Sequence, residues 1–234
     1  MLNLSEIFQT IQGEAMFTGT PSIFIRTQGC DVGCSFCDTK YTWEFSHQIS
    51  DQEEAWAHLI NRSRSPEAFK MFGFRLEADF LIQKLKAWAP TVRHLVITGG
   101  EPMAQPGQIR AFISEAIVSG YSVQIETSGT YLIDLPGLSS VWITCSPKIG
   151  MRGGREVLAQ AIARADEIKF PIGKPADADK LIKFMEDHDL DPQKIPIWVQ
   201  PLSQGKSATD LCLDLCYRLG VRLSIQTHKY IGLD

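Results

Sequence analysis

Three of the six cysteines, Cys30, Cys34 and Cys37, lie within eight residues with the spacing C-x3-C-x2-C. Three thiolates on one short loop can each hold one iron of a [4Fe–4S] cube, which leaves the fourth iron open to a small molecule. A structural zinc site usually needs four ligands in two pairs, and the sequence has neither a second C-x2-C nor a zinc spacing that includes His47. Chance clustering of core cysteines is disfavoured by the glycine and polar residues between them. The motif therefore predicts an open iron–sulfur cluster.

Glycine and polar residues also follow several apolar runs. Residues 98–102 read Thr-Gly-Gly-Glu-Pro, and glycines without a Cβ allow the backbone to approach a ligand closely. The alternative for this motif is a tight strand-to-helix turn. Residues 126–129 and 146–148 offer hydroxyls and charges that suit a ribose, a carboxylate or another anion, and ordinary polar turns are the alternative there. Each motif is a predicted ligand contact.

Upstream, the segment around Gln12 and Glu14 offers an amide and a carboxylate, and Arg26 offers a guanidinium. An acid and an amide can pair with the N–H and carbonyl edge of a pterin or guanine, while a guanidinium can fork onto a carboxylate. The alternative is that residues 7–14 form a solvated N-terminal arm. The set predicts a site for a heterocycle that carries a carboxylate.

Strand-like apolar runs alternate with helical patterns along the chain, which predicts βα units and a parallel sheet. We expect strands at 22–27, 94–98, 122–126, 141–144, 167–170, 197–200 and 222–226, and helices at 51–60, 77–89, 107–119, 155–165, 176–187 and 207–219. Such units build an open sheet or a barrel, and periodicity does not decide between them. Because the polar motifs follow strand ends, they should meet the cysteine loop at one edge of the sheet.

The composition fits a single domain spanning residues 1–234, with an irregular excursion expected at 61–75. The net charge of −4 argues against a broad nucleic-acid-binding face, and no apolar run is long enough to span a membrane. Residues 1–6 show no secretory pattern, so we expect a cytoplasmic protein with reduced thiols. Cys145, Cys212 and Cys216 lie in apolar patterns and are expected to pack in the core.

With Phe36 before its last cysteine, the cysteine motif resembles the signature of the radical S-adenosylmethionine (SAM) superfamily, and residues 99–101 are similar to its GGE motif. The wider set resembles the 7-carboxy-7-deazaguanine synthases, radical SAM enzymes that make the deazaguanine core of queuosine precursors. That set comprises Gln12-Gly13-Glu14, Arg26, the cysteine motif through Thr39, and residues 98–102, 126–129, 146–148 and 226–230. Residues 151–154 and 200–201 place the resemblance closest to the enterobacterial-type members.

This resemblance implies a partial, modified TIM-like barrel of mostly parallel strands, a homodimer and a flavodoxin-type reductant. It implies a [4Fe–4S] cluster on Cys30, Cys34 and Cys37, and Mg2+ on the hydroxyl of Thr39. The implied SAM contacts are Phe36, Cys37, Asp38, Gly100, Glu101, Glu126, Ser128, Ser146, Pro147 and Lys148. The implied substrate contacts are Gln12, Gly13, Glu14, Arg26, Thr98 and His228. Some relatives end in a proline that reaches the substrate, whereas this chain ends in Gly-Leu-Asp.

The implied reaction is ring contraction of 6-carboxy-5,6,7,8-tetrahydropterin to 7-carboxy-7-deazaguanine with release of ammonia. It starts from a radical derived from SAM and involves no direct contact with nucleic acid or membrane. A glycyl-radical enzyme activase is one alternative, because it shares the cysteine spacing, although it acts on a protein. A non-catalytic iron–sulfur redox protein is the other, and an electron carrier has no need of the strand-end motifs.

Overall fold

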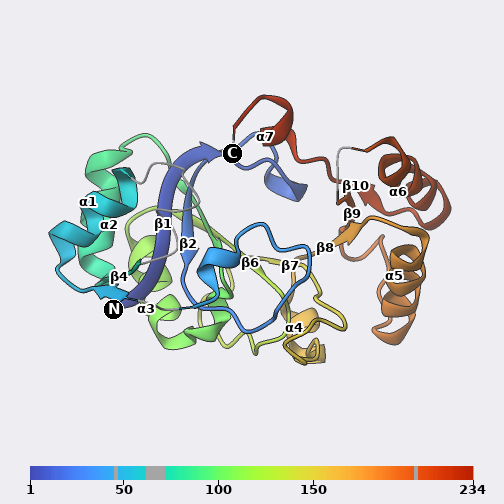
Figure 1. Cartoon of the computed structure of the whole chain (residues 1–234), viewed down its shortest axis with the longest axis horizontal. Coiled ribbons are helices and arrows are strands. Elements are labelled where there is room, and N and C mark those ends of the chain that lie inside the picture. Colours follow the sequence, from blue (N-terminus) through green and yellow to red (C-terminus); the bar gives the residue numbers. More distant parts are fainter. Residues whose placement is uncertain (45–46, 62–71, 203–204, 234) are drawn as a thin grey trace.

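One ten-stranded sheet organises the protein in the computed structural model, which describes residues 1–44, 47–61, 72–202 and 205–233 (Figure 1). The strands are β1 (Leu2–Ile11), β2 (Pro21–Thr27), β3 (His47–Ile49), β4 (Phe72–Leu76), β5 (His94–Gly99), β6 (Ser122–Thr127), β7 (Trp142–Cys145), β8 (Glu167–Ile172), β9 (Ile197–Pro201) and β10 (Arg222–Leu223). Their order is β10-β9-β8-β7-β6-β5-β2-β1-β4-β3. Among the strand pairs formed by the described residues, those of β1 with β2 and with β4 are antiparallel and the others are parallel. With β10 and β3 at its edges, the sheet stays open, and the expected partial barrel of mostly parallel strands is confirmed.

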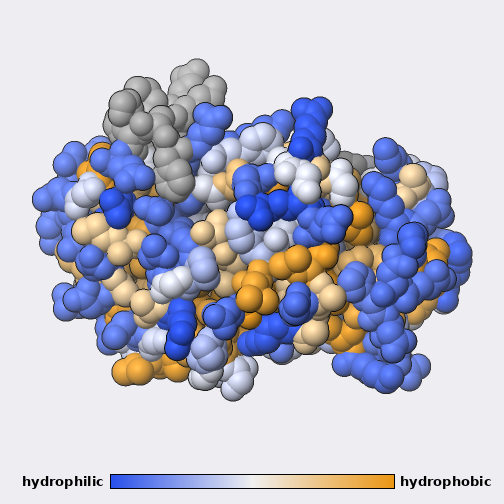
Figure 2. Space-filling model, turned by 90° about the horizontal axis from the view of Figure 1, so that it is seen from below, coloured by the Kyte–Doolittle hydropathy of each residue, from blue (hydrophilic) through white to orange (hydrophobic). Residues whose placement is uncertain are grey.

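Helices cover the outer side of this curved sheet, as Figure 1 shows for α1 and α2 at one end and α5 and α6 at the other. The helices are α1 (Gln52–Asn61), α2 (Ala78–Trp88), α3 (Pro106–Val118), α4 (Ala159–Arg164), α5 (Pro175–Asp187), α6 (Lys206–Leu219) and α7 (Thr227–Tyr230), with 3-10 turns at Ala15–Phe17, Lys40–Thr42 and Pro102–Ala104. A helix with the length and apolar character needed to cross a bilayer is not found in the part of the chain that the structure describes. In Figure 2, hydrophilic side chains cover both ends of the lower face and an apolar band crosses its middle.

Side chains alternate across the strands in a way that separates the core from the site. On β8, Ile168 and Phe170 are buried among apolar residues, while Lys169 between them points to the opposite side, into the cavity described below. On β6, Val123 and Ile125 pack in the core. Because successive residues of a strand point to opposite faces, each strand can bury its apolar side under a helix and turn polar side chains inward.

The N-terminal segment is a strand and not a solvated arm. Residues 2–11 form β1, whose Leu2, Leu4 and Ile7 are buried. β1 turns back on β2 in an antiparallel pair that joins Ile7 with Ile25 and Phe8 with Phe24. The sequence prediction missed β1 because its apolar residues change phase at a register shift between Leu4 and Glu6, which breaks the strict alternation typical of a half-buried strand.

The predicted strands and helices are found, with changes at their ends. The strand expected at 222–226 is limited to 222–223, and the helix expected at 155–165 to 159–164. The excursion expected at 61–75 does not include its last residues, because Phe72–Leu76 forms β4 and pairs with β1. The rest of that excursion, residues 62–71, lies outside the described residues.

Candidate active site

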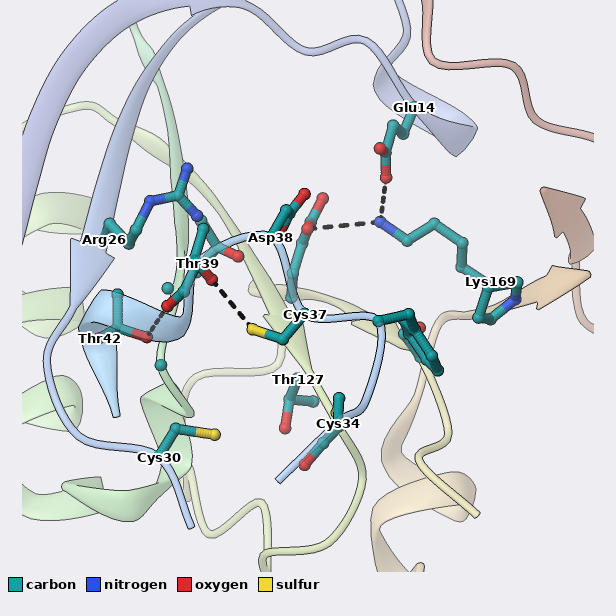
Figure 3. A pocket seen from close by; sticks show the side chains of 18 of the residues that line it. Glu14, Arg26, Cys30, Cys34, Cys37, Asp38, Thr39, Thr42, Thr127 and Lys169 are labelled. Carbon is teal, nitrogen blue, oxygen red and sulfur yellow. Dashed lines mark hydrogen bonds and ion pairs between the residues drawn. The ribbon is translucent and has the colours of Figure 1, made fainter. Parts of the chain in front are cut away.

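A cavity of about 410 Å³ lies at the carboxyl ends of the parallel strands. Its wall combines the cysteine loop (residues 28–39), the inner side of β1 and β2, the ends of β5, β6, β8 and β9, and α7. In parallel α/β folds these strand ends form the edge where ligands bind. The sheet order therefore brings together segments that are far apart in the sequence (Figure 3).

Two glycines and backbone hydrogen bonds to neighbouring segments fix the conformation of the cysteine loop. Gly29 and Gly33 adopt φ angles of 101° and 69°, which glycine reaches without strain. The N–H of Gly29 donates to the carbonyl of Thr42 over 2.7 Å, and the N–H of Glu101 donates to the carbonyl of Gly29 over 2.9 Å. The loop is thus held by Glu101, which follows β5, and by Thr42, which lies in the 3-10 turn after the loop.

All three cysteines of the loop line the cavity. Burial raises the pKa of the Cys30 thiol to about 11 and also raises the pKa of Cys34. Metal binding would therefore displace protons from thiols that are otherwise neutral. Three cysteines suit an iron–sulfur cube, in which each thiolate holds its own iron, better than a structural zinc ion, which usually takes four protein ligands.

Gly99 and Gly100 are required by the packing of β5 against the cysteine loop. A Cβ on Gly100 would lie 2.2 Å from the carbonyl oxygen of Gly29, and a Cβ on Gly99 would lie 2.3 Å from the backbone nitrogen of Thr27. Gly99 also has a φ of 121°, which side-chain-bearing residues rarely adopt. The two glycines let the end of β5 pack closely on the end of β2 and on Gly29 of the cysteine loop, a role that the sequence motif alone did not indicate.

The carboxylate of Glu101 is buried and accepts hydrogen bonds from other residues of the protein. The residue is 2% exposed, and its oxygens accept hydrogen bonds from Thr127 Oγ1 at 2.7 Å, Ser128 N at 2.8 Å and Met103 N at 3.0 Å. These bonds join the end of β5 to the end of β6. The side chain predicted to contact SAM thus positions the residues after β6 at the cavity wall.

Arg26 projects from β2 into the cavity (Figure 3), and its Nε forms an ion pair with Glu6. Tyr41 donates its hydroxyl to the same carboxylate over 2.8 Å, and the guanidinium carbon lies 5.6 Å from the centre of the Phe8 ring. Burial disfavours the charge, but Glu6 outweighs burial and the pKa of Arg26 is raised. In the described part of the chain, the two terminal nitrogens of Arg26 donate no hydrogen bond, so they are available to an anionic ligand.

The carboxylate of Glu14 lies against a buried lysine that the sequence reasoning missed. Lys169 Nζ forms an ion pair with Glu14 and lies 3.4 Å from Glu126 Oε2 (Figure 3). The other oxygen of Glu14 accepts from the amides of Gln226 at 2.7 Å and Gln200 at 3.2 Å. Burial raises the pKa of Glu14, but Lys169 and the amide of Gln226 outweigh burial and hold that pKa at about 2.

The other predicted residues are placed as follows. Those that line the cavity include Phe36, Asp38, Thr39, Thr98, Ser128, Ser146, Lys148 and His228. Gln12 is 1% exposed, and its amide nitrogen donates to Gln124 and Glu126. Pro147 lines a neighbouring pocket of about 460 Å³. Gly13 lies under His228, where a Cβ would meet the ring Nδ1 at 2.1 Å, so its role in this structure is packing.

Comparison with known proteins agrees with this geometry. The family model "Radical SAM superfamily" matches residues 24–138, which include the cysteine loop and the end of β5. The fold and the site together define a radical SAM enzyme. The chain is 40% identical over 98% of both chains to the 7-carboxy-7-deazaguanine synthase of Escherichia coli K12, and 33% identical to that of Rickettsia prowazekii, covering 100% of this chain and 89% of the relative. The crystal structure of QueE from Escherichia coli superposes with a TM-score of 0.84 at 39% identity, covering 96% of this chain and 93% of that one. The chain belongs to the 7-carboxy-7-deazaguanine synthase family.

Proposed function

We propose that this protein converts 6-carboxy-5,6,7,8-tetrahydropterin to 7-carboxy-7-deazaguanine in queuosine precursor synthesis, as a carbon–nitrogen lyase. Substrate and product differ by one ammonia, so the reaction needs no net oxidant. One observation carries the proposal: in a chain 40% identical to a synthase of this name, the three cysteines share a cavity with Glu14 and Arg26. A thiol cluster and a site for a carboxylated heterocycle are the two parts that such a reaction requires.

The cysteines would hold a [4Fe–4S] cluster, and SAM would contact Phe36–Asp38, Gly100, the residues after β6 and residues 146–148. When bound, the cluster and SAM supply the one-electron chemistry that starts abstraction of a substrate hydrogen. Lys148 Nζ lies 5.7 Å from the centre of the Phe36 ring and donates to Ser146 Oγ over 2.6 Å. The ammonium and the aromatic ring thus form one wall of the proposed SAM site.

The substrate would lie between Arg26 and Glu14. The terminal nitrogens of Arg26, which donate no hydrogen bond to a described residue, suit the 6-carboxylate, because a guanidinium presents two parallel donors. The carboxylate of Glu14 suits the N–H donors of the pterin edge. The residues of this cavity orient the substrate toward the cysteine loop and, by enclosing it, exclude water from the reacting atoms.

Mg2+ at Thr39 is a further part of the proposal. Thr39 lines the cavity, and its Oγ1 lies 3.6 Å from Cys37 Sγ, so a cation bound there would stand beside the cysteine loop. Mg2+ prefers oxygen ligands and usually keeps several waters, so one hydroxyl and substrate oxygens could complete its sphere.

A Thr39→Val variant is expected to lose the stimulation of product formation by Mg2+, with kcat lower by about tenfold or more. Valine keeps the shape of threonine but removes the hydroxyl oxygen. Turnover is measured on metal-free reconstituted enzyme as Mg2+ is added back, with the exposed Thr91→Val as the matched control. Stimulation of Thr39→Val equal to that of the wild type would rule out a cation held by this hydroxyl.

The test of the proposed function is anaerobic reconstitution with iron and sulfide, followed by incubation with SAM, dithionite and 6-carboxytetrahydropterin. Formation of 7-carboxy-7-deazaguanine with release of ammonia is expected. SAM cleavage without this product would contradict the proposal and favour a glycyl-radical enzyme activase. No SAM cleavage at all would favour an iron–sulfur redox protein.

We further propose a cytoplasmic homodimer that receives electrons from a flavodoxin-type protein and contacts neither nucleic acid nor membrane. The apolar band in Figure 2 supports contact with another protein surface, because contiguous exposed apolar patches often mark such contacts. The net charge of −4 supports a small-molecule substrate over a nucleic acid.

A further inference from the structure

Lys169 joins two parts of the cavity wall that the proposed function assigns to different ligands. Its ammonium pairs with Glu14, which follows β1 on the proposed substrate side, and with Glu126, near the end of β6 on the proposed SAM side. The side chain of Lys169 is 8% exposed, and those of Glu14 and Glu126 are 12% and 18% exposed. Buried charges are retained only where they are paired, so this ammonium compensates the charge of both carboxylates, while neutral amides donate further hydrogen bonds to each.

The carboxylate of Glu14 has one cationic partner, Lys169, and two neutral amide partners that a ligand could replace. A carboxylate offers about four lone-pair sites, of which Lys169, Gln200 and Gln226 take three. A ligand N–H can use the remaining site or displace one of the neutral amides. Displacing the ammonium would leave two buried carboxylates uncompensated. The geometry therefore separates a fixed partner from partners that a ligand can exchange.

Several other titratable groups face this pair from the surrounding elements. Glu167 of β8 accepts hydrogen bonds from Thr144 and Trp198, which occupy its carboxylate. His228 of α7 lies near Glu14, and burial lowers its pKa. Lys148, after β7, lies near Lys169 and Glu126, and burial lowers its pKa as well. Lys169 is the cation that directly contacts both carboxylates.

We propose that Lys169 is a positioning residue for the substrate, which keeps Glu14 ionised and oriented so that its carboxylate accepts hydrogen bonds from the N–H edge of the pterin. This inference rests on the proposed function. A protonated Glu14 would present a hydroxyl donor to the N–H groups of that edge and would bind it poorly. Lys169 therefore acts through Glu14 and is assigned no contact with the reacting atoms.

The test uses anaerobically reconstituted enzyme and compares Lys169→Gln and Lys169→Arg with the wild type. Lys183→Gln is the matched control, because Lys183 on α5 pairs with Asp187 and its side chain is 74% exposed. We expect Lys169→Gln to raise the Kd for 6-carboxytetrahydropterin by about tenfold or more, since a charge-assisted pair orients the binding carboxylate. The Kd for SAM should rise by less than the Kd for the pterin, because Lys169 lies farther from Glu126, at 3.4 Å, than from Glu14, and Glu126 keeps its bond from Gln12.

The pH profile of kcat/KM supplies a readout that a purely structural role would not move. In the wild type the pKa of Glu14 is about 2, so the carboxylate is ionised throughout the neutral range. Without Lys169, burial is no longer opposed by the ammonium and raises that pKa. The Lys169→Gln variant should therefore lose kcat/KM as pH falls toward the acidic side and regain it as pH rises. Lys169→Arg, which keeps the charge, should restore the wild-type profile.

The outcomes separate this inference from the proposed function. A wild type that fails to bind or convert the pterin refutes the proposed function. A wild type that converts it, beside a Lys169→Gln variant with unchanged pterin Kd or an unchanged pH profile, refutes the inference alone, and so does equal weakening of pterin and SAM binding. If Lys169→Gln does not fold, the Lys169→Arg variant provides the test. A pH profile of kcat/KM for Lys169→Arg that differs from the wild-type profile on its acidic side would contradict the inference.

Discussion

Cys34→Ala is expected to abolish formation of 7-carboxy-7-deazaguanine, with kcat/KM lower by at least about a thousandfold, or roughly 4 kcal/mol of transition-state stabilisation. Cys34 is 9% exposed at the cavity, between Cys30 and Cys37 on the same loop. Removing one of three thiolates leaves an iron without a protein ligand. Iron and sulfide content, the visible absorbance of the reconstituted protein and product formation should fall together.

Cys216→Ala is the matched control for this variant. Cys216 lies on α6, on the outer side of the sheet, and does not line the cavity. Its removal deletes a thiol of the same type without touching the cysteine loop, so iron content and turnover should stay at wild-type levels. A Cys34→Ala protein that retained its full iron content and its turnover would contradict the assignment of the loop as the cluster site.

The sequence was sufficient to predict the parallel strands β2 and β5 to β10, but not β3 and β4, which also pair in parallel. Strands such as Glu167–Ile172 and Ile197–Pro201 are short, β-branched runs bounded by turns, and their local pattern determines their type. The N-terminal strand β1 was missed, because a register shift breaks its alternation and because β4, one of its two partners, lies far along the chain. Pairing between distant segments leaves no local signal, so the pairing of β1 with β4 was not predictable.

The site shows the same division between local and distant information. The cysteine spacing and the strand-end motifs are local, and the structure places their residues around one cavity. Lys169 is 155 residues from Glu14 in the chain, and only its position within an apolar strand hinted at a special role. Likewise, the ion pair of Arg26 with Glu6 depends on the register of β1 against β2. The sequence identified residues with reactive or ligand-binding side chains, whereas the residues that pair with them could be identified only from the folded structure.

Arg26→Met is expected to lower kcat/KM for 6-carboxytetrahydropterin by about a hundredfold or more, because truncating one side of a buried charged pair typically costs about 2–5 kcal/mol. The guanidinium is held by Glu6 through Nε, and its terminal nitrogens donate no hydrogen bond within the described part of the chain, so they can donate to a ligand carboxylate. Arg26→Lys should recover part of the loss, since an ammonium keeps the charge but lacks the planar fork. The loss should appear mainly in the Kd and KM for the pterin, while SAM binding and iron content stay unchanged. Steady-state kinetics and pterin titration on reconstituted enzyme measure these quantities.

Binding of a pterin that lacks the 6-carboxylate provides a second test. Comparing both pterins in the wild type and in Arg26→Met forms a double-mutant cycle, in which one change is in the side chain and the other is in the ligand. The wild type should bind the carboxylated pterin much more tightly than the analogue, and in Arg26→Met that preference should shrink to within about threefold, because the partner of the carboxylate is gone. Arg110→Met, on the exposed face of α3, is the control and should keep the full preference. Arg26→Met also leaves Glu6 without its cation, and this loss of stability would weaken both ligands to a similar extent. Equal weakening of the two ligands would therefore assign Arg26 to the support of β1, and a selective loss of the carboxylated pterin assigns it to the substrate.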